Sequence, residues 1–321
     1  MPEDSPLVSI IIPLYNAQQW IADTITSALH QTWPRKEIIV VDDGSTDDSL
    51  AVVQSIDAPE LTVFTQENQG ACAARNRAFK HATGDYIQYL DADDLMAPNK
   101  IEVQVRRLEE EPPRTIAYAP WGVFDEDPAD ADFDTSNQTW RDYADPIEWL
   151  VTWASGNGGA RSHAWLTPRC LVEEAGPWNE SLRINQDGEF FSRVLLRSGG
   201  IAFCSDTEVY YRSASRGVSL RRDRSGWKSL YRSYEMIFRR ILEREESPRT
   251  RHSCAARWEN FKHGAYPTCT DLAQKAEEKI DRLGGTDYQV GGSSLYLILE
   301  SILGWKAARF IQDRYRKLIY E

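Results

Sequence analysis

Short apolar strands alternate with helical segments over the first hundred residues of this 321-residue chain. The strand candidates are runs of β-branched and aromatic residues at 8–12, 37–41, 61–64 and 85–90, the first of them closed by Pro13. The segments between them, 21–32, 46–56 and 70–82, carry apolar or alanine residues at helical spacing. This alternation predicts an α/β fold with a mostly parallel sheet covered by helices on both faces.

Acidic residues follow the predicted strands at the points where those strands end. Asp42 and Asp43 come after the second strand, and Asp91 and Asp93 come after the fourth. Ligands of such sheets bind beyond the carboxyl ends of the strands. Carboxylate oxygens suit Mg2+ or Mn2+, but Asp-x-Asp alone fits a turn or a helix N-cap equally well.

Composition narrows the functional classes. The formal net charge of −12 argues against general nucleic-acid binding. There is no uninterrupted apolar run of about 18 residues and no basic region followed by an apolar stretch at the N-terminus, so we expect neither a membrane span nor a signal peptide. The five scattered cysteines form no C-x-x-C pair, which predicts free thiols in the cytoplasm.

The second half of the chain differs from the first. Residues 1–150 hold 10 basic and 28 acidic side chains, whereas residues 151–321 hold 27 and 21. An acidic stretch at 125–145 is expected to be a solvated loop. Helices are predicted over 225–246, 252–264, 270–283 and 293–320. We therefore predict a catalytic domain at 1–215 and a helical extension at 216–321.

Four segments follow one another in a recognisable order. They are VSIIIPLYN at 8–16, VVDDGSTD at 40–47, NQGACAARN at 68–76 and GDYIQYLDADD at 84–94. Together they resemble the N-terminal half of family-2 glycosyltransferases, inverting enzymes of the GT-A fold that use nucleotide-sugars. The resemblance is dense over about residues 7–100 and returns over about 163–212.

The resemblance implies roles in the nucleotide-binding half, about residues 7–100. Pro13 and Tyr15 would line the nucleobase pocket, with Tyr15 stacked on the base. Asp43 would accept the imide N–H of the base, which suits uracil. The alternatives are a core aromatic for Tyr15 and a turn residue for Asp43.

The same resemblance implies the groups that hold the diphosphate. Arg75 would lie near the base and the diphosphate, Asp91 would bind the ribose, and Asp93 would ligate a Mn2+ or Mg2+ ion that bridges the phosphates. Arg75 could equally be a solvated helix residue.

In the acceptor half, about residues 101–215, the resemblance implies which residue is the catalytic base. In this family an acidic pair opens the helix that carries the base, and here the pair reads Gln186-Asp187. Asp187 is the predicted base, since displacement at the anomeric carbon needs a carboxylate near the acceptor hydroxyl. Glu189 is the rival, and Asp187 could also cap a helix at 188–198.

Three further residues accompany this motif. Trp165 and Trp178 would shape the sugar pocket together with Gln186, although core packing explains the tryptophans equally well. His163 is expected at the surface or behind the site.

The chain departs from the family pattern in two places. Many relatives place a histidine after the segment that here reads Tyr210-Tyr211-Arg212, but this chain continues with Ser-Ala-Ser-Arg. Arg212 or Arg216 would then neutralise phosphate charge, in a basic run at 212–232 that we expect to close over the diphosphate. The Gln-x-x-Arg-Trp signature of processive synthases is absent, which predicts transfer of one sugar per encounter.

The leading hypothesis is thus a UDP-sugar-dependent transferase acting on a glycan or lipid-linked acceptor. No Gly-rich phosphate loop follows the first strand, which argues against a sugar nucleotidylyltransferase. No G-x-G-x-x-G follows it either, which argues against a dehydrogenase. A catalytically silent scaffold at a membrane remains an alternative.

The tail at 293–320 interleaves apolar and basic residues. Such a helix suits the anionic inner face of the cell membrane. Alternatively, it packs its apolar face on the catalytic domain.

Overall fold

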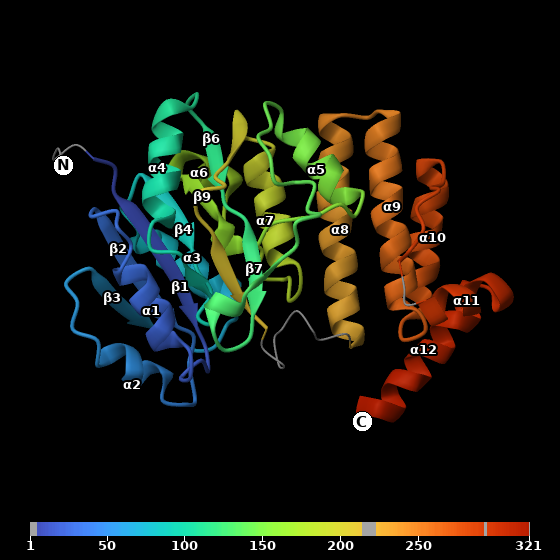
Figure 1. Cartoon of the computed structure of the whole chain (residues 1–321), viewed down its shortest axis with the longest axis horizontal. Helices are drawn as coiled ribbons and strands as arrows, with labels where there is room; N and C mark the ends of the chain where they lie inside the picture. The colour runs from blue at the N-terminus through green and yellow to red at the C-terminus, as the bar shows by residue number, and fades with distance from the viewer. Residues whose placement is uncertain (1–4, 214–222, 292–293, 321) are drawn as a thin grey trace.

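A mostly parallel sheet lies at the centre of the N-terminal part of the chain, up to residue 213 (Figure 1). The computed structural model describes residues 5–213, 223–291 and 294–320. The seven strands run in the order β10-β6-β9-β4-β1-β2-β3, and only β9 is antiparallel to its neighbours β4 and β6. Their bounds are β1 (Val8–Leu14), β2 (Lys36–Asp42), β3 (Leu61–Thr65), β4 (Tyr86–Tyr89), β6 (Thr115–Tyr118), β9 (Trp165–Pro168) and β10 (Gly200–Phe203).

The four predicted strands are confirmed, and the first is longer than expected. β1 continues through Pro13 to Leu14. Leu90 donates its N–H to the carbonyl of Ile11, so the backbone polar groups of Ile11 point toward the β4 side of β1. The backbone of Pro13, two residues later, points to the same side. The pairing with β4 has ended by then, so the N–H that proline lacks is not needed there.

Alternate residues of the central strands serve the two faces of the sheet. Ile10 and Ile12 of β1 belong to one apolar cluster, and Ile11 belongs to the other. Both faces are buried because helices cover both, as the continuous apolar runs predict. The helices of this half are α1 (Ile21–Leu29), α2 (Ser49–Gln54), α3 (Ala71–His81), α4 (Lys100–Glu110), α5 (Pro146–Ala154), α6 (Arg169–Ala175) and α7 (Gln186–Leu195).

A second, smaller sheet lies beside the first, and its short strands come from segments between residues 95 and 212. Its strands run in the order β5-β11-β7-β8. The acidic stretch at 125–145 is therefore not a loop throughout, since Asp132 pairs with Val123 and residues 128–130 form a 3-10 turn. The remaining bounds are β5 (Leu95–Met96), β7 (Trp121–Phe124), β8 (Asp132–Phe133), β11 (Val209–Arg212), η1 (Pro128–Asp130) and η2 (Ser162–Ala164).

The C-terminal part is helical, as predicted, and its first helices pack on the catalytic half. Three helices lie side by side next to α7 (Figure 1). Tyr231, Ile237 and Trp258 belong to the same apolar cluster as Ile11 of β1. Pro248 is the first residue of the second of these helices, because a proline fits the first turn. The bounds are α8 (Arg224–Arg244), α9 (Pro248–Ala265) and α10 (Thr270–Leu283).

The tail forms two helices, α11 (Ser294–Leu303) and α12 (Trp305–Tyr320), separated at Gly304 with φ +79°. Trp305 stacks on His263 of α9 with ring centroids 4.3 Å apart, and Ala308 is fully buried. Most of the apolar side chains that the structure describes in the tail are exposed. Its exposed members are Leu297, Ile298, Ile302, Leu303, Phe310, Ile311 and Tyr315.

No helix among the described residues combines the length and the apolar character that crossing a membrane requires.

Candidate active site

The predicted site residues follow β1, β2 and β4, three neighbouring strands. The chain runs from β1 to β2 and β3 on one side and then returns to place β4 on the other side of β1. Such a reversal opens a crevice at the carboxyl ends of the strands. Tyr15, Asp43 and Asp91 stand directly beyond those ends, and Tyr15 is 49% exposed, so it is not a core aromatic.

Asp43 is buried and holds the loop that precedes α3. One carboxylate oxygen accepts hydrogen bonds from the side chain of Gln66 and the N–H of Gln69, and the other accepts from the N–H of Gly70 at 2.7 Å. Asp43 is therefore more than a local turn residue, since it fixes a segment 23 to 27 residues away.

Arg75 joins the two halves of the site. It is 6% exposed, which excludes a solvated helix residue. Its guanidinium forms an ion pair with Asp91 and donates to Oε1 of Gln186 at 3.2 Å, while its plane lies 4.5 Å from the ring of Trp178. A side chain from the nucleotide-binding half thus meets the first residue of α7, which also carries Asp187.

Asp91 and Asp93 experience opposite electrostatic environments. Burial opposes ionisation of Asp91, but the Arg75 guanidinium outweighs it and holds the pKa of Asp91 below its ordinary value. Burial, together with the charges of Asp94 and Asp91, raises the pKa of Asp93 to about 7. Asp91 therefore has a guanidinium that balances its charge, whereas at Asp93 the negative charges of its neighbours are not balanced in this way.

Arg212 and His163 lie behind this carboxylate cluster. Arg212 is 7% exposed, donates through Nε to the carbonyl of Asp93 and through its guanidinium to the carbonyl of Asp125. Its guanidinium is thus used within the protein, against the expectation that it would reach phosphate. His163 is fully buried, with Nδ1 3.0 Å from Asp94, so of its two expected positions it occupies the one behind the site and not the one at the surface.

Asp187 lies in the first turn of α7 and lines a cavity of about 230 Å³. The helix begins at Gln186, after Asn185 in the left-handed region at φ +58°, so Asp187 is not its cap. A volume above about 150 Å³ can hold a six-membered ring. Four tryptophans contribute to the wall: Trp121, Trp149, Trp153 and Trp165.

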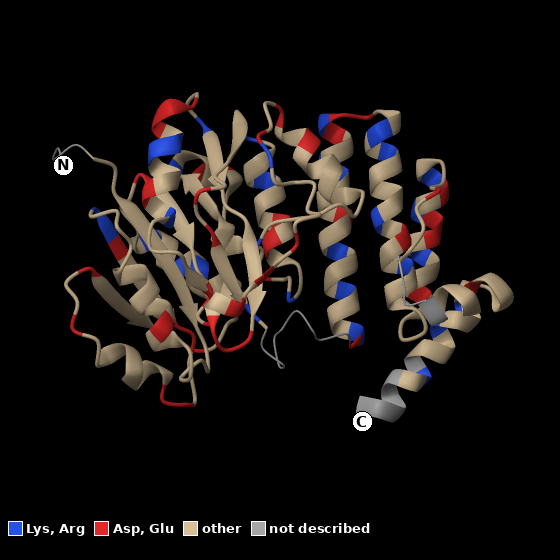
Figure 2. Ribbon diagram, viewed as in Figure 1, with Lys and Arg blue, Asp and Glu red and all other residues tan. Residues whose placement is uncertain are grey.

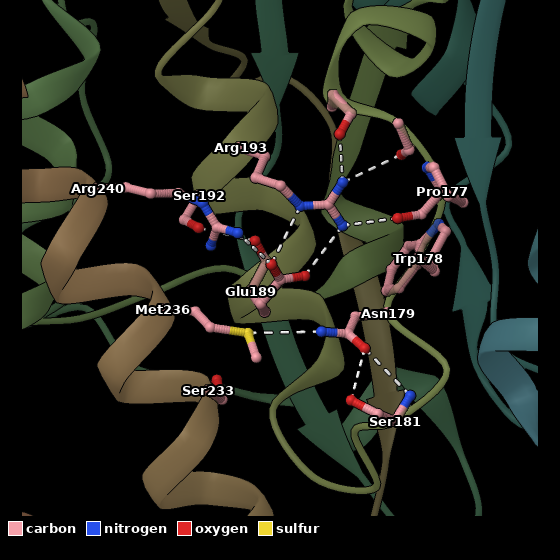
Figure 3. Close-up of polar contacts among 12 residues, drawn as sticks. Pro177, Trp178, Asn179, Ser181, Glu189, Ser192, Arg193, Ser233, Met236 and Arg240 are labelled. Atoms are coloured by element: carbon pink, nitrogen blue, oxygen red, sulfur yellow. Dashed lines mark hydrogen bonds and ion pairs between the residues drawn. The ribbon is translucent and has the colours of Figure 1, made fainter.

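Glu189 is not available as a catalytic base. It is 1% exposed, and its carboxylate is paired with Arg193 of the same helix and Arg240 of α8 at 3.0 and 2.8 Å (Figure 3). A buried carboxylate held between two guanidinium groups has no route to an acceptor hydroxyl. This rival prediction is wrong.

Helix α8 also holds the residues directly before Asp187. Ser229 accepts hydrogen bonds from the N–H groups of Arg183 and Ile184 at 2.8 and 3.0 Å, and Ser233 accepts from the side chain of Asn185. The C-terminal helices therefore support the start of α7.

The two tryptophans of the predicted sugar pocket occupy different places. Trp165 is 2% exposed but contributes to the cavity that Asp187 lines. Trp178 is equally buried, stacks on Phe190 at 4.2 Å between ring centroids, and lies beneath Arg75 in the core. Arg216 lies outside the described residues.

The donor set around Asp93 fits a hard divalent cation, because a dication offsets both the burial and the carboxylate repulsion that raise the pKa of Asp93. No group of three or more His, Cys, Asp or Glu within the described ranges forms a complete metal site. Mg2+ is usually held by one or two carboxylates plus substrate phosphates, which matches this arrangement.

Comparison with known proteins bears on the same segments. Residues 9–163 match the model of Glycosyl transferase family 2. The match shows similarity to this family over just under half of the chain, ending at His163. The α/β fold expected from the GT-A resemblance is confirmed as well.

Two relatives illustrate the match to this family. The putative teichuronic acid biosynthesis glycosyltransferase TuaG of Bacillus subtilis is 44% identical over 117 residues, 36% of this chain and 45% of TuaG. The β-1,3-glucosyltransferase WfgD of Escherichia coli, named for UDP-Glc and α-D-GlcNAc-diphosphoundecaprenol, is 42% identical over 106 residues, 33% of this chain and 42% of WfgD. The chain therefore spans under half the length of these relatives.

Solved structures extend the similarity of fold to nearly the whole chain. S. aureus TarS 1–349 in complex with UDP-GlcNAc has a TM-score of 0.69 and 18% identity, over 98% of this chain and 93% of that one. The mannosyltransferase PcManGT from Pyrobaculum calidifontis, in complex with GDP-Man and Mn2+, has a TM-score of 0.59 and 18% identity, over 99% and 88%. The helical C-terminal part is thus included in the shared fold.

Sequence reasoning missed Arg161, which lines the cavity with Asp187, and Ser162, which contacts Asp91 at 3.3 Å. They stand directly before the motif that begins at His163. That adjacency was the signal available for finding them.

Proposed function

We propose that this protein is an inverting glycosyltransferase that moves one sugar from a nucleotide-sugar to a hydroxyl acceptor. The observation that supports this most strongly is the contact of Arg75 with both Asp91 and Gln186. It brings the residues after β4 and the start of α7 to one place, although they are about 95 positions apart in the chain.

The roles proposed for the residues follow from their positions. Tyr15, Asp43, Arg75 and Asp91 bind and orient the nucleotide at the carboxyl ends of the strands. Asp187, on the cavity side of α7, removes the proton of the acceptor hydroxyl as that oxygen attacks the anomeric carbon and the diphosphate leaves. Trp165 provides an apolar wall for a sugar ring.

A divalent cation, Mn2+ or Mg2+, is proposed at Asp93. When bound, such an ion stabilises negative charge on a leaving diphosphate. The raised pKa of Asp93 and the Mn2+ bound to PcManGT support this proposal.

UDP is the proposed nucleotide, and a glycan or lipid-linked sugar is the proposed acceptor class. The names of WfgD and of the TarS complex, which both include a UDP-sugar, support the donor. The WfgD name, with its diphosphoundecaprenol acceptor, supports the acceptor class.

The deciding experiment is the release of UDP from a panel of UDP-sugars, with and without Mn2+. We expect slow hydrolysis of one donor that stops in a chelator. Retained liposome binding without turnover of any nucleotide-sugar would instead favour the scaffold alternative.

Peripheral contact with an anionic membrane, at the cytoplasmic face, is proposed for the tail. Its exposed apolar residues on α11 and α12 adjoin the basic side chains of Lys306 and Arg314, a combination typical of interfacial helices. The five free thiols agree with a reducing compartment.

A further inference from the structure

Arg161 occupies an unusual position in the wall of the Asp187 cavity. Its guanidinium lies 4.4 Å from the ring centre of Trp121 and 4.1 Å from that of Tyr211. Contact with two aromatic rings fixes the plane of the guanidinium and leaves its N–H groups directed along its edges. The side chain is therefore held in place before any ligand arrives.

The same guanidinium has no acidic partner within residues 5–213, 223–291 and 294–320. No ion pair involves it, and its Nε is buried without a hydrogen-bond acceptor. Nε of Arg75 also lacks an acceptor, but Arg75 is ion-paired with Asp91 and Arg193 with Glu189, and Arg161 has no such pair in the part of the chain that the structure describes. A buried N–H without an acceptor is costly, so such a group favours a ligand that supplies one.

The surroundings of Arg161 define what kind of ligand this is. The cavity has an aromatic wall that suits the face of a sugar ring, and Asp187 contributes the carboxylate that we propose as base. A planar guanidinium matches the two oxygens of a carboxylate or phosphate. The ligand that satisfies both features is a sugar with an anionic substituent.

We infer that Arg161 binds a carboxylate or phosphate group carried by one of the two sugar substrates. This inference rests on the proposed function and narrows it from sugars in general to acidic ones. The anionic group belongs either to the transferred sugar of the donor, as in a uronic acid, or to the acceptor beside it.

Two measurements separate these sources. The donor arm compares hydrolysis of UDP-glucuronate with that of UDP-glucose. The acceptor arm uses calorimetry in the presence of UDP and Mn2+ to compare binding of glucuronate and glucose 6-phosphate with binding of glucose. We expect a preference for the anionic member of about tenfold or more in one arm, as a charge-assisted pair provides.

Substitutions then assign that preference to this side chain. Arg161→Gln is expected to abolish it, and Arg161→Lys to retain part of it because the charge remains. Arg141→Gln is the matched control, since Arg141 also lies over an aromatic ring, at 4.7 Å from Tyr143, but does not line the cavity. Thermal unfolding of each variant shows that the protein remains folded.

The outcomes are distinct from those that test the proposed function. Equal treatment of anionic and neutral ligands in both arms, or a preference that survives Arg161→Gln, would overturn the inference while UDP-sugar hydrolysis still supports the transferase. Failure to hydrolyse any UDP-sugar would count against the transferase, whereas a preference for anionic sugars in calorimetry that Arg161→Gln removes would still support this site.

Discussion

Asp91 and Asp93 are two positions apart, yet their pKa values move in opposite directions. Burial raises the pKa of both, but the Arg75 guanidinium paired with Asp91 outweighs it there, whereas Asp93 also faces the charges of Asp94 and Asp91. An unfolded aspartate ionises near pH 4. Between pH 4 and about 7 the folded protein retains a proton that the unfolded chain has lost, so the free energy of unfolding falls as pH rises through this window.

Asp93→Asn removes this conflict. We expect the variant to be more stable than the parent at pH 8, by up to about 4 kcal/mol, and nearly equal at pH 4, in thermal unfolding with a chelator present. The same variant should lose Mn2+-linked UDP binding. A stability difference that does not depend on pH would contradict the assignment.

Asp187→Asn tests the base at the same scale. Because the amide cannot accept the proton, kcat for transfer should fall by about 100- to 10,000-fold, while UDP affinity measured by calorimetry stays close to that of the parent. Normal transfer by this variant would refute the role of Asp187.

At the scale of elements, α7 depends on α8 for its position. Glu189 of α7 is paired with Arg240 of α8, and Asn179 donates to Met236 of the same helix (Figure 3). Basic positions recur along α8 and α9 (Figure 2), and Arg240 is the one that faces Glu189. The C-terminal helices therefore fix the helix that carries the proposed base.

Arg240→Met should destabilise the protein by about 2 kcal/mol and lower kcat for transfer about tenfold, with little change in UDP affinity. Arg239→Met is the matched control, since Arg239 makes only an exposed pair with Glu243 and should change neither quantity appreciably. Equal effects of the two substitutions would show that the Glu189 pair does not position α7.

The order of elements in the first hundred residues was predictable from sequence, but the contacts between distant segments were not. A continuous apolar run identified β1 because both faces of this strand are buried. The ion pair that excludes Glu189 as the catalytic base involves Arg240, 51 residues later, and no pattern in the sequence near Glu189 predicts it. The two-residue strands β5 and β8 escaped prediction because they are too short to show a period.

At the scale of the whole molecule, the tail is attached at a few points and leaves a large apolar surface. Trp305 and Ala308 contact the body, whereas Ile302 is 72% exposed. Exposed apolar patches of this kind mark interaction surfaces. Figure 2 shows that α11 is nearly free of charged positions.

Ile298→Ser combined with Ile302→Ser should weaken co-sedimentation with vesicles of anionic phospholipid at least tenfold and leave UDP-sugar hydrolysis unchanged. Ser301→Ala, on the same helix, is the control. Vesicle binding that persists in the double variant would show that another surface makes the contact.

The ion pair and hydrogen bond of Arg75 have a consequence for kinetics. Asp91 stands on the side proposed for the donor, and Gln186 begins the helix proposed to serve the acceptor. Replacing Arg75 disturbs both at once, so the Michaelis constants of the two substrates are expected to change together. Such a variant therefore measures how well the donor and the acceptor are aligned with each other. It cannot separate the binding of the donor from the binding of the acceptor.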